Sequence, residues 1–415
     1  MSHKKLTIGL FGFGVVGEGI YRVLQDTQSL NASIKKICIK HIDKERNAPA
    51  ALFTDNADEL LNDEEINVIV ELIDDADAAY SIVTKALRQH KSVVSANKKL
   101  IANHHQELIS LRDEFGVSFL YEAAVCGSVP VIRNLEEYYD NDLLSSVSGI
   151  VNGSTNYILT KMKEEQLPYE TALKQAQELG FAESDPTLDV EGIDAVNKLT
   201  IILKHAYGIN EIPEDILYSG ITQIHERDIQ YAQEKGFNIK LIAQSIQVEA
   251  GKVAAFILPT FVDQENRLFS VRNEFNGVLI GSKLADEQFL YGKGAGRYPT
   301  SSAVLSDIAA LRYDYKYEYK KTALGIQNEL SNEVYLQVYV SFESWDTIEK
   351  EHFVAIEQVF KSTARNYIIG TVKLDTLHNA EWFYDKNVSV IALGTGVITD
   401  GELVHNAASV LELAQ

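Results

Sequence analysis

The stretch LTIGLFGFGVVG, residues 6–17, decides the fold of the first part of the chain. An apolar run leads into a G-x-G-x-x-G pattern, and a helical pattern follows it. In that context Gly12 permits a tight turn, Gly14 lets the backbone approach a pyrophosphate, and Gly17 allows close packing of helix on strand. The amides at the helix start then hold the anion. A glycine turn of another α/β protein is the alternative. The stretch predicts a dinucleotide site formed by Gly12, Phe13, Gly14, Val15, Val16 and Gly17.

Short β-rich runs alternate with helical patterns through the first third of the chain. In chain order we expect strand 6–11, helix 18–25, strand 34–42, strand 67–73, helix 76–88 and strand 92–95. Strands separated by helices pair in parallel through right-handed crossovers. This pattern predicts a doubly wound, Rossmann-type α/β domain over residues 1–130.

The pattern changes after Ser128. We expect strand 143–151, helices 169–179 and 193–205, and paired strands 239–248 and 252–258. Such an order indicates an α+β unit, which we place at 131–325. A third piece, 330–415, has predicted strand 334–342, helix 353–362, strands 367–374 and 388–393, and helix 407–414.

Composition limits the classes of partner. The chain has 415 residues, enough for two or three domains, and 38 basic against 59 acidic side chains give a net charge of −21. That balance argues against a nucleic acid or an anionic membrane held by a basic surface. No run approaches the ~18 to 20 apolar residues that span a bilayer. Cys38 and Cys126 form neither a disulfide framework nor a zinc pattern, so we expect a reducing, cytoplasmic location.

Four tyrosines alternate with charged residues near residue 315. On a strand, Tyr313, Tyr315, Tyr317 and Tyr319 would share one face. Two interpretations are open: a stacking platform for bases, or an aromatic sheet face covered by another domain or subunit. The acidic net charge favours the second.

The residue that selects NAD or NADP lies about 20 positions after the glycines. Lys40 and His41 occupy that place, and Asp43 comes slightly late for the ribose of NAD. The 2′-phosphate of NADP can be met by Lys40, Lys44 and Arg46, or these are solvated side chains at a strand end. The sequence therefore favours NADP over NAD only slightly.

Three polar, glycine-containing clusters follow, at 121–132, 149–158 and 180–199. In the first, Glu122 stands among small apolar residues, where a carboxylate is costly unless it is paired or binds a cation. In the third, Asp194 and Lys198 are four residues apart and share one face of a mostly apolar helix. An exposed helix salt bridge is the alternative to a functional pair.

These clusters, together with SANK at 95–98 and GKGAGRYPT at 292–300, resemble the homoserine dehydrogenases. The resemblance spans roughly residues 6–311 and involves five motifs in order. It implies NAD(P)H-dependent interconversion of L-aspartate 4-semialdehyde and L-homoserine, a step toward threonine and methionine. It also implies a small-molecule substrate, a homodimer or higher homo-oligomer formed through the α+β domain, and a return of about 294–311 to the nucleotide domain.

The resemblance also assigns roles to residues. It implies Lys198, Lys98 and Asp194 as catalytic residues, with either lysine as the proton donor. For the substrate it implies Glu183 and Asp194, and more weakly Asp189. Besides the glycine turn and Lys40, it places Asn97, Lys98, Gly180, Glu183, Gly294 and Gly296 at the cofactor. A monovalent cation, Na⁺, would be held by Glu122 and by the backbone of Val125, Gly127 and Val129.

The C-terminal piece resembles the family least. Many members carry a regulatory ACT domain there, of order βαββαβ. We expect a small ACT-like α/β domain, with feedback by threonine as a hypothesis and a domain that only packs as the alternative. Two rival functions are an oxidoreductase acting on another semialdehyde or on sugars, and a nucleotide-sensing regulator. The first does not account for the spacing of Glu183, Asp194 and Lys198. The second has no reason to retain Lys98, Asp194 and Lys198 together.

Overall fold

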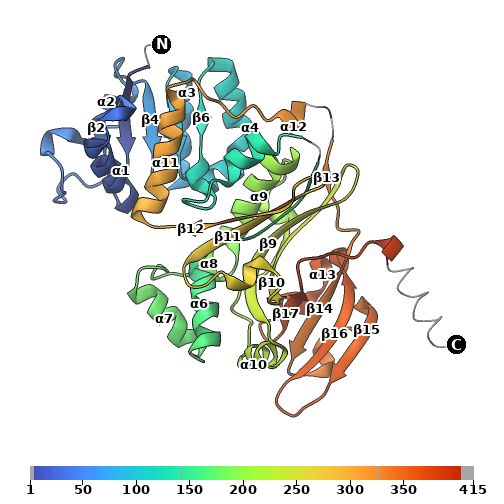
Figure 1. Ribbon diagram of the computed structural model, residues 1–415. Helices are drawn as coiled ribbons and strands as arrows, with labels where there is room; N and C mark the ends of the chain where they lie inside the picture. The colour runs from blue at the N-terminus through green and yellow to red at the C-terminus, as the bar shows by residue number, and fades with distance from the viewer. Residues whose placement is uncertain (1–3, 142, 324, 326, 403–415) are drawn as a thin grey trace. The chain divides into compact units, whose positions relative to one another are not determined.

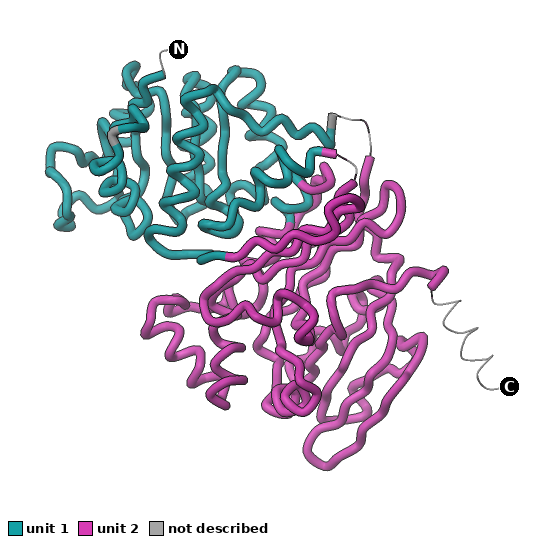
Figure 2. Tube along the Cα trace, viewed as in Figure 1, with its two compact units in different colours: residues 1–140, 200–205, 292–323 teal, residues 141–199, 206–291, 324–415 magenta. Residues whose placement is uncertain are grey.

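The computed structural model describes residues 4–141, 143–323, 325 and 327–402. The chain divides into two compact units (Figure 2). Unit 1 comprises Met1–Asp140, Thr200–His205 and Gly292–Ala323, and unit 2 comprises Asn141–Leu199, Ala206–Tyr291 and Leu324–Gln415. The helix predicted at 407–414 lies outside the described residues. Each unit is built around its own sheet (Figure 1).

Unit 1 contains a six-stranded parallel sheet within the described residues. Its strands, in spatial order, are β3 (Phe53–Thr54), β2 (Ala32–Cys38), β1 (Leu6–Phe11), β4 (Val68–Glu71), β5 (Ser92–Ser95) and β6 (Phe119–Leu120). From β1 the chain winds outward in both directions. The crevice for a ligand in such a sheet lies where the order reverses, at the carboxyl ends of β1 and β4.

In the part of the chain that the structure describes, four helices connect strands of this sheet, which gives the predicted Rossmann-type order: α1 (Val15–Asp26), α2 (Asp58–Leu61), α3 (Ala76–Arg88) and α4 (Lys98–Phe115). The helices α5 (Val131–Arg133), α11 (Arg297–Leu311) and α12 (Lys320–Ala323) follow the last strand of the sheet in the chain. Right-handed crossovers place α1 and α3 on opposite faces of the sheet, because their strands wind in opposite directions. The late helix α11 packs beside α1, and α4 packs beside α3.

Unit 2 is built on one mixed sheet of eleven strands within the described residues. The main path, in spatial order, is β12 (Asp286–Lys293), β11 (Phe275–Ser282), β7 (Leu144–Ile150), β9 (Asn238–Glu249), β10 (Lys252–Val262), β17 (Ser389–Leu393), β14 (Tyr335–Phe342), β16 (Asn366–Lys373) and β15 (Phe353–Phe360). Two short strands, β8 (Leu217–Tyr218) and β13 (Glu329–Leu330), also pair with β10.

The helices of this unit include those that bear the predicted site residues Asp189, Asp194 and Lys198. They are α6 (Gly153–Glu164), α7 (Tyr169–Glu178), α8 (Thr187–Val190), α9 (Ile193–Tyr207), α10 (Glu226–Lys235) and α13 (Leu374–Asn379). The second half of α9, Thr200–His205, belongs to unit 1. Its first two turns carry Asp194 and Lys198 and belong to unit 2.

One predicted element of the C-terminal segment is wrong. Residues 353–362 were expected to form a helix, but Phe353–Phe360 is strand β15, paired antiparallel with β16. Two short 3₁₀ turns, Trp345–Thr347 and Lys350–His352, stand where the first helix of a βαββαβ unit would be. The strands β17-β14-β16-β15 also continue the sheet of β10, through the parallel pair Thr260 and Ala392.

The alternating tyrosines are a second correction. Residues 313–319 form no strand, because Asp314 and Tyr319 have φ of 55° and 49°, which interrupts an extended chain. Tyr313 is 64% exposed, whereas Tyr317 is fully buried. The Tyr319 hydroxyl lies 2.6 Å from that of Tyr121 inside unit 1. Tyr317 and Tyr319 are therefore core residues, and the four rings do not share one face of a strand.

Candidate active site

The glycine turn lies between β1 and α1 at the switch point of unit 1. Gly12 has φ of +93°, and a Cβ there would lie 2.6 Å from the Leu72 carbonyl oxygen. A Cβ on Gly17 would lie 2.3 Å from the Gly12 oxygen, so both positions require glycine. A Cβ on Gly14 would meet nothing within 4 Å. The space beside Gly14 therefore suits a pyrophosphate at the α1 N-terminus.

The end of β2 lies beside this turn. The Gly12 amide donates to the Cys38 carbonyl oxygen at 3.0 Å. Lys40 follows two residues later and is exposed. Its backbone is thus close to the edge at which the ribose of a dinucleotide lies in this fold.

A buried carboxylate that sequence reasoning did not identify lies at the end of β4. Glu71 is fully buried and accepts hydrogen bonds from the Ser95 hydroxyl at 2.6 Å and from the Ile73 amide at 2.7 Å. Burial, the largest cause, raises the pKa of Glu71 to about 7. A carboxylate within an apolar run such as NVIVELI at the end of a predicted strand is the signal that could have identified it.

Ser95 links this carboxylate to the residues predicted at the cofactor. The Ser95 oxygen also accepts from the Asn97 amide at 3.1 Å. Asn97 caps α4 by accepting from the Leu100 amide at 2.9 Å, and its side-chain nitrogen donates to the Ile73 carbonyl. Lys98 is the first residue of α4. The network therefore fixes the backbone from which Lys98 projects.

In unit 2 the predicted ion pair forms at the start of α9. Lys198 Nζ lies 2.7 Å from Asp194 Oδ2, and the two residues are only 8% and 3% exposed. The ammonium also donates to the Val151 carbonyl oxygen at 2.8 Å. Surface ion pairs of this spacing contribute little to stability, whereas this pair is shielded from water and the Val151 carbonyl oxygen holds the ammonium in place.

Asn152 joins that pair to a second carboxylate. Its side-chain nitrogen donates to Asp194 at 2.9 Å and to Asp189 at 2.7 Å, and its side-chain oxygen caps α6 at the Thr155 amide. Burial and the nearby Asp194 charge raise the pKa of Asp189. Asn152 belongs to the second cluster, 149–158. Its contacts with the third cluster connect residues 37 and 42 positions apart, which spacing cannot reveal.

The remaining substrate and cofactor candidates lie on turns. Gly180, with φ of +74°, and the exposed Glu183 follow α7, and the Glu183 carbonyl accepts from Gln177. In unit 1, Gly294 lies against the turn of Gly127, where a Cβ would be 2.4 Å from the Gly294 oxygen. Gly296, with φ of +110°, directly precedes α11.

Glu122 is buried at a short turn of unit 1. Its two carboxylate oxygens accept from the Ile132 and Arg133 amides, each at 2.9 Å. Burial, followed by the neighbouring Asp307, raises the pKa of Glu122 to about 8. The carboxylate and the backbone oxygens of Val125, Gly127 and Val129 offer oxygen donors, the type a hard cation prefers.

Comparison with known proteins identifies the family. A family model described as homoserine dehydrogenase matches residues 130–309, and one described as the NAD-binding domain of homoserine dehydrogenase matches residues 12–122. A homoserine dehydrogenase of Bacillus subtilis is 33% identical over 403 residues, covering 91% of this chain and 93% of the relative. The chain belongs to the homoserine dehydrogenase family.

Other relatives agree. A homoserine dehydrogenase of Lactococcus lactis is 38% identical over 317 residues, 74% of each chain. The solved structure of a homoserine dehydrogenase from Thiobacillus denitrificans has a TM-score of 0.80 at 27% identity, covering 94% of this chain and 98% of that one. One from S. aureus has a TM-score of 0.71 at 30% identity, covering 95% and 100%.

The predicted family and reaction are thereby confirmed. The protein is an NAD(P)-dependent oxidoreductase that interconverts L-aspartate 4-semialdehyde and L-homoserine. It binds a nicotinamide cofactor. Within the described residues no helix is long and apolar enough to cross a membrane. An ACT domain at the C-terminus stays a prediction.

Proposed function

We propose that Lys198 is the group of unit 2 that supplies the proton when the aldehyde of L-aspartate 4-semialdehyde is reduced. The bound nicotinamide cofactor supplies the hydride. A buried ammonium beside the substrate oxygen stabilises a developing alkoxide more than a neutral aldehyde, which lowers the barrier. The buried pair with Asp194, oriented by the Val151 carbonyl, is the observation that carries this proposal.

Lys98 and the acidic residues complete the proposed site. Lys98 projects from the α4 start fixed by Asn97, and we assign it to the nicotinamide and the substrate oxygen. The substrate's ammonium group requires carboxylates, which Asp194, Asp189 and the exposed Glu183 offer. The raised pKa of Asp189 supports this role, because a bound ammonium would offset the repulsion between its carboxylate and Asp194.

The preferred cofactor is proposed to be NADPH. Support comes from Lys40 after β2, which offers a cation for a 2′-phosphate. A hyperthermophilic archaeal homoserine dehydrogenase, 26% identical with a TM-score of 0.65, was solved in complex with NADPH. Beside the glycine turn, the backbone of Gly180, Glu183, Gly294 and Gly296 is proposed to line the cofactor.

A monovalent cation, Na⁺, is proposed at Glu122. The donor set is all oxygen, and it combines one carboxylate with the carbonyls of Val125, Gly127 and Val129. A bound cation would stabilise the ionised form that burial disfavours. Stabilisation of the protein by Na⁺ in the millimolar range, lost in Glu122→Gln, is the expected result of a thermal melt. Equal stabilisation of both proteins would contradict the site.

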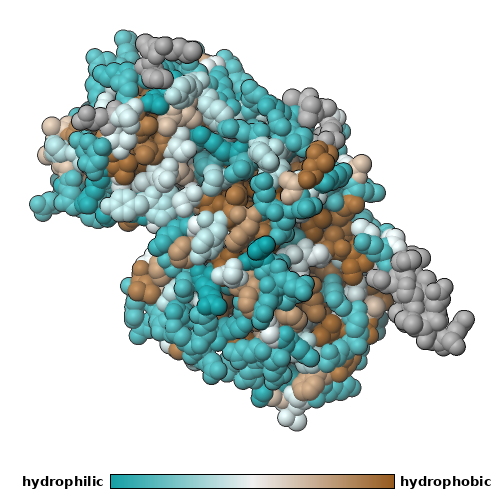
Figure 3. Space-filling model, viewed as in Figure 1, coloured by the Kyte–Doolittle hydropathy of each residue, from teal (hydrophilic) through white to brown (hydrophobic). Residues whose placement is uncertain are grey.

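A homodimer is proposed on the basis of exposed apolar side chains on the sheet of unit 2, at strand β15 of the C-terminal piece and not in the α+β unit at 131–325 through which the resemblance implied the dimer. In the view of Figure 3, hydrophilic residues cover much of the surface and apolar residues gather over strands of this unit. Val354, Ile356, Val359 and Phe360 on β15 are each more than 40% exposed, on a strand at the end of the sheet. Such an edge is a template for another chain. Light scattering that gives a monomer mass would refute this proposal.

One assay tests the catalytic proposal. Oxidation of NADPH and of NADH by L-aspartate 4-semialdehyde is measured for wild type, for Lys198→Ala and for a control, Lys161→Ala. Lys161 of α6 forms an i,i+4 pair with Glu165, the residue after the helix, and has no proposed role. We expect a large loss of turnover only in Lys198→Ala, with cofactor binding intact. Near-wild-type turnover in Lys198→Ala would exclude the assigned role.

A further inference from the structure

An asparagine on β11 donates to the same carbonyl oxygen as the proposed proton donor. Asn276 is fully buried in unit 2, and its side-chain nitrogen donates to the Val151 oxygen at 3.1 Å. The Lys198 ammonium donates to that oxygen at 2.8 Å. Because both nitrogens bind one atom, they lie within two hydrogen-bond lengths of each other. The contact also fixes the orientation of the Asn276 amide, since a carbonyl oxygen can only accept.

The Val151 carbonyl lies just beyond the ladder that joins β7 to β11. β7 ends at Ile150, which pairs with Gly277 of β11, and the chain then leaves the sheet for α6. Hydrogen bonds from two side chains, Asn276 and Lys198, therefore set the direction of this carbonyl. Asn276 supplies its bond from the neighbouring strand, so it holds the oxygen against the frame of the sheet.

The two acceptors of the Lys198 ammonium are each held by an asparagine. Asp194 Oδ2 accepts from the ammonium at 2.7 Å and from the Asn152 side chain at 2.9 Å. The Val151 oxygen accepts from the ammonium and from Asn276. An ammonium has three N–H groups, and these two acceptors take two of them. The direction of the third, which would face the substrate oxygen, is then fixed by the tetrahedral nitrogen.

The other end of the Asn276 amide indicates that its nitrogen is the group that the site uses. The oxygen, Oδ1, is buried and has no hydrogen-bond partner among the described residues. A buried acceptor without a partner costs free energy, so stability alone would favour an apolar side chain of similar size. The bond from the Asn276 nitrogen to the Val151 oxygen therefore explains an asparagine at this place.

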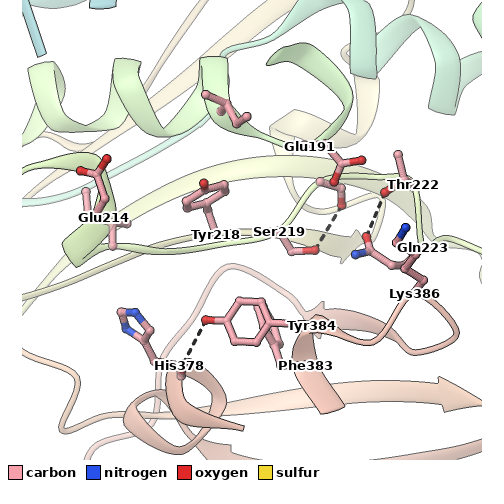
Figure 4. Close-up of a pocket in the computed structure, with 13 residues that line it drawn as sticks. Glu191, Glu214, Tyr218, Ser219, Thr222, Gln223, His378, Phe383, Tyr384 and Lys386 are labelled. Atoms are coloured by element: carbon pink, nitrogen blue, oxygen red, sulfur yellow. Dashed lines mark hydrogen bonds between the residues drawn. The ribbon is translucent and has the colours of Figure 1, made fainter. Parts of the chain in front are cut away.

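Packing at the start of α9 leaves the ammonium to be held by hydrogen bonds. Glu191, just before this helix, and Ile193, its first residue, line a cavity of about 680 Å³ (Figure 4). Side chains beside such a space lack contacts on one side, so packing restrains them less. Neither Lys198 nor Asn276 lines this cavity. Their shared contact comes from the β7 and β11 side, where the sheet supplies a fixed frame.

We propose that Asn276 is a positioning residue of the reduction: through the Val151 carbonyl it aims the Lys198 ammonium at the substrate oxygen. The inference rests on the proposed role of Lys198. Alignment of a proton donor lowers the barrier in the transition state without binding the aldehyde itself. Loss of the Asn276 nitrogen should therefore lower kcat and leave the KM for the aldehyde unchanged.

The test measures kcat, the KM for L-aspartate 4-semialdehyde and the thermal midpoint. The proteins are wild type, Asn276→Leu, Asn366→Leu and Lys198→Ala. Leucine keeps the volume of Asn276 and removes both the nitrogen and the unpaired oxygen, so we expect a thermal midpoint close to that of wild type. Misalignment of the proton donor should lower kcat of Asn276→Leu about 10- to 100-fold.

Asn366→Leu is the matched control. Asn366 is a buried asparagine on β16 of the same unit, and its nitrogen donates to the Glu343 carbonyl oxygen at 2.8 Å. Its oxygen accepts from the Ser362 amide at 3.2 Å. Asn366→Leu should therefore lower the thermal midpoint, because both ends of the amide lose a bond, and keep the kcat of wild type.

The outcomes separate this inference from the proposed function. A kcat near that of wild type in Asn276→Leu, with a large loss in Lys198→Ala, would overturn the positioning role alone. So would a raised KM at unchanged kcat, which would place Asn276 on the substrate, or an equal fall in kcat in Asn366→Leu. A kcat near that of wild type in Lys198→Ala would instead contradict the proposed function. If Asn276→Leu does not fold, Asn276→Asp, which keeps the shape and replaces the donor by an acceptor, takes its place with the same expected fall in kcat.

Discussion

Replacement of Lys198 by methionine tests two roles of the buried Asp194–Lys198 pair at the start of α9, one in stability and one in catalysis. The substitution keeps most of the side-chain volume and removes the charge, which leaves Asp194, 3% exposed, without its ion-pair partner. Breaking a buried pair from one side costs about 3–5 kcal/mol of stability. Loss of a positioned proton donor lowers kcat by a factor of about 10² to 10⁴. We therefore expect Lys198→Met to be both less stable and nearly inactive.

The double variant Asp194→Asn with Lys198→Met distinguishes stability from chemistry. It removes both charges, so no uncompensated ion stays buried, and the thermal midpoint should recover most of the loss. Turnover should not recover, because the proton donor is still absent and the proposed substrate carboxylate Asp194 is removed as well. The assays are thermal melts, steady-state kinetics with L-aspartate 4-semialdehyde, and NADPH binding by fluorescence. Turnover that recovers together with stability would refute the catalytic role and leave Lys198 a structural residue.

Three further predictions concern unit 1. Gly14→Ala should have the melting temperature of wild type, because the added Cβ meets no protein atom, but it should bind NADPH more weakly, because the Cβ occupies space that the pyrophosphate needs. Gly17→Ala should lower the melting temperature, because its Cβ would lie 2.3 Å from the Gly12 oxygen. Lys40→Ala should raise the KM for NADPH about tenfold and leave that for NADH unchanged, and equal changes would contradict the 2′-phosphate contact. Glu71 has a pKa of about 7 in the folded chain, above its usual 4.5, so wild type loses stability as pH rises between these values. In chemical denaturation, Glu71→Gln should gain up to about 3 kcal/mol relative to wild type from about pH 5 to about pH 8, and a pH-independent difference would contradict the shifted pKa.

Features set by local sequence were predictable. The glycine turn requires particular backbone angles and close approaches at Gly12 and Gly17, so the residue types themselves indicate the structure. The helix at 76–88 and the strand at 92–95 have the bounds that periodicity predicts. The i,i+4 spacing of Asp194 and Lys198 likewise predicted a pair that the fold then buries.

The error at 353–362 has a different origin. Phe353, Ile356 and Phe360 follow helical spacing, so the local pattern favours a helix. In the structure the segment pairs with β16, and the ladder of backbone hydrogen bonds outweighs the periodicity. β15 is the last strand of the sheet, and apart from Phe353 its residues are exposed. Because neither face of the strand is buried, its sequence need not alternate between apolar and polar residues. Tertiary pairing of this kind is absent from a local sequence window.

Asn152 and Glu71 illustrate why the active site is less predictable than the fold. Each acts through partners far along the chain: Asn152 joins Asp189 and Asp194, and Glu71 binds Ser95, 24 residues away. Hydrogen-bond networks of this kind have no periodicity, because their geometry exists only after the strands and helices have packed. The same physical rule explains the contacts of both residues: burying a polar group costs free energy unless hydrogen-bond partners are held in place for it. The polar groups that sequence reasoning overlooked therefore hold the proposed catalytic residues Lys98, Asp194 and Lys198 in position. Replacing Asn152 by alanine should accordingly lower kcat through Asp194 without changing the affinity for NADPH, and a change in NADPH affinity alone would contradict that role.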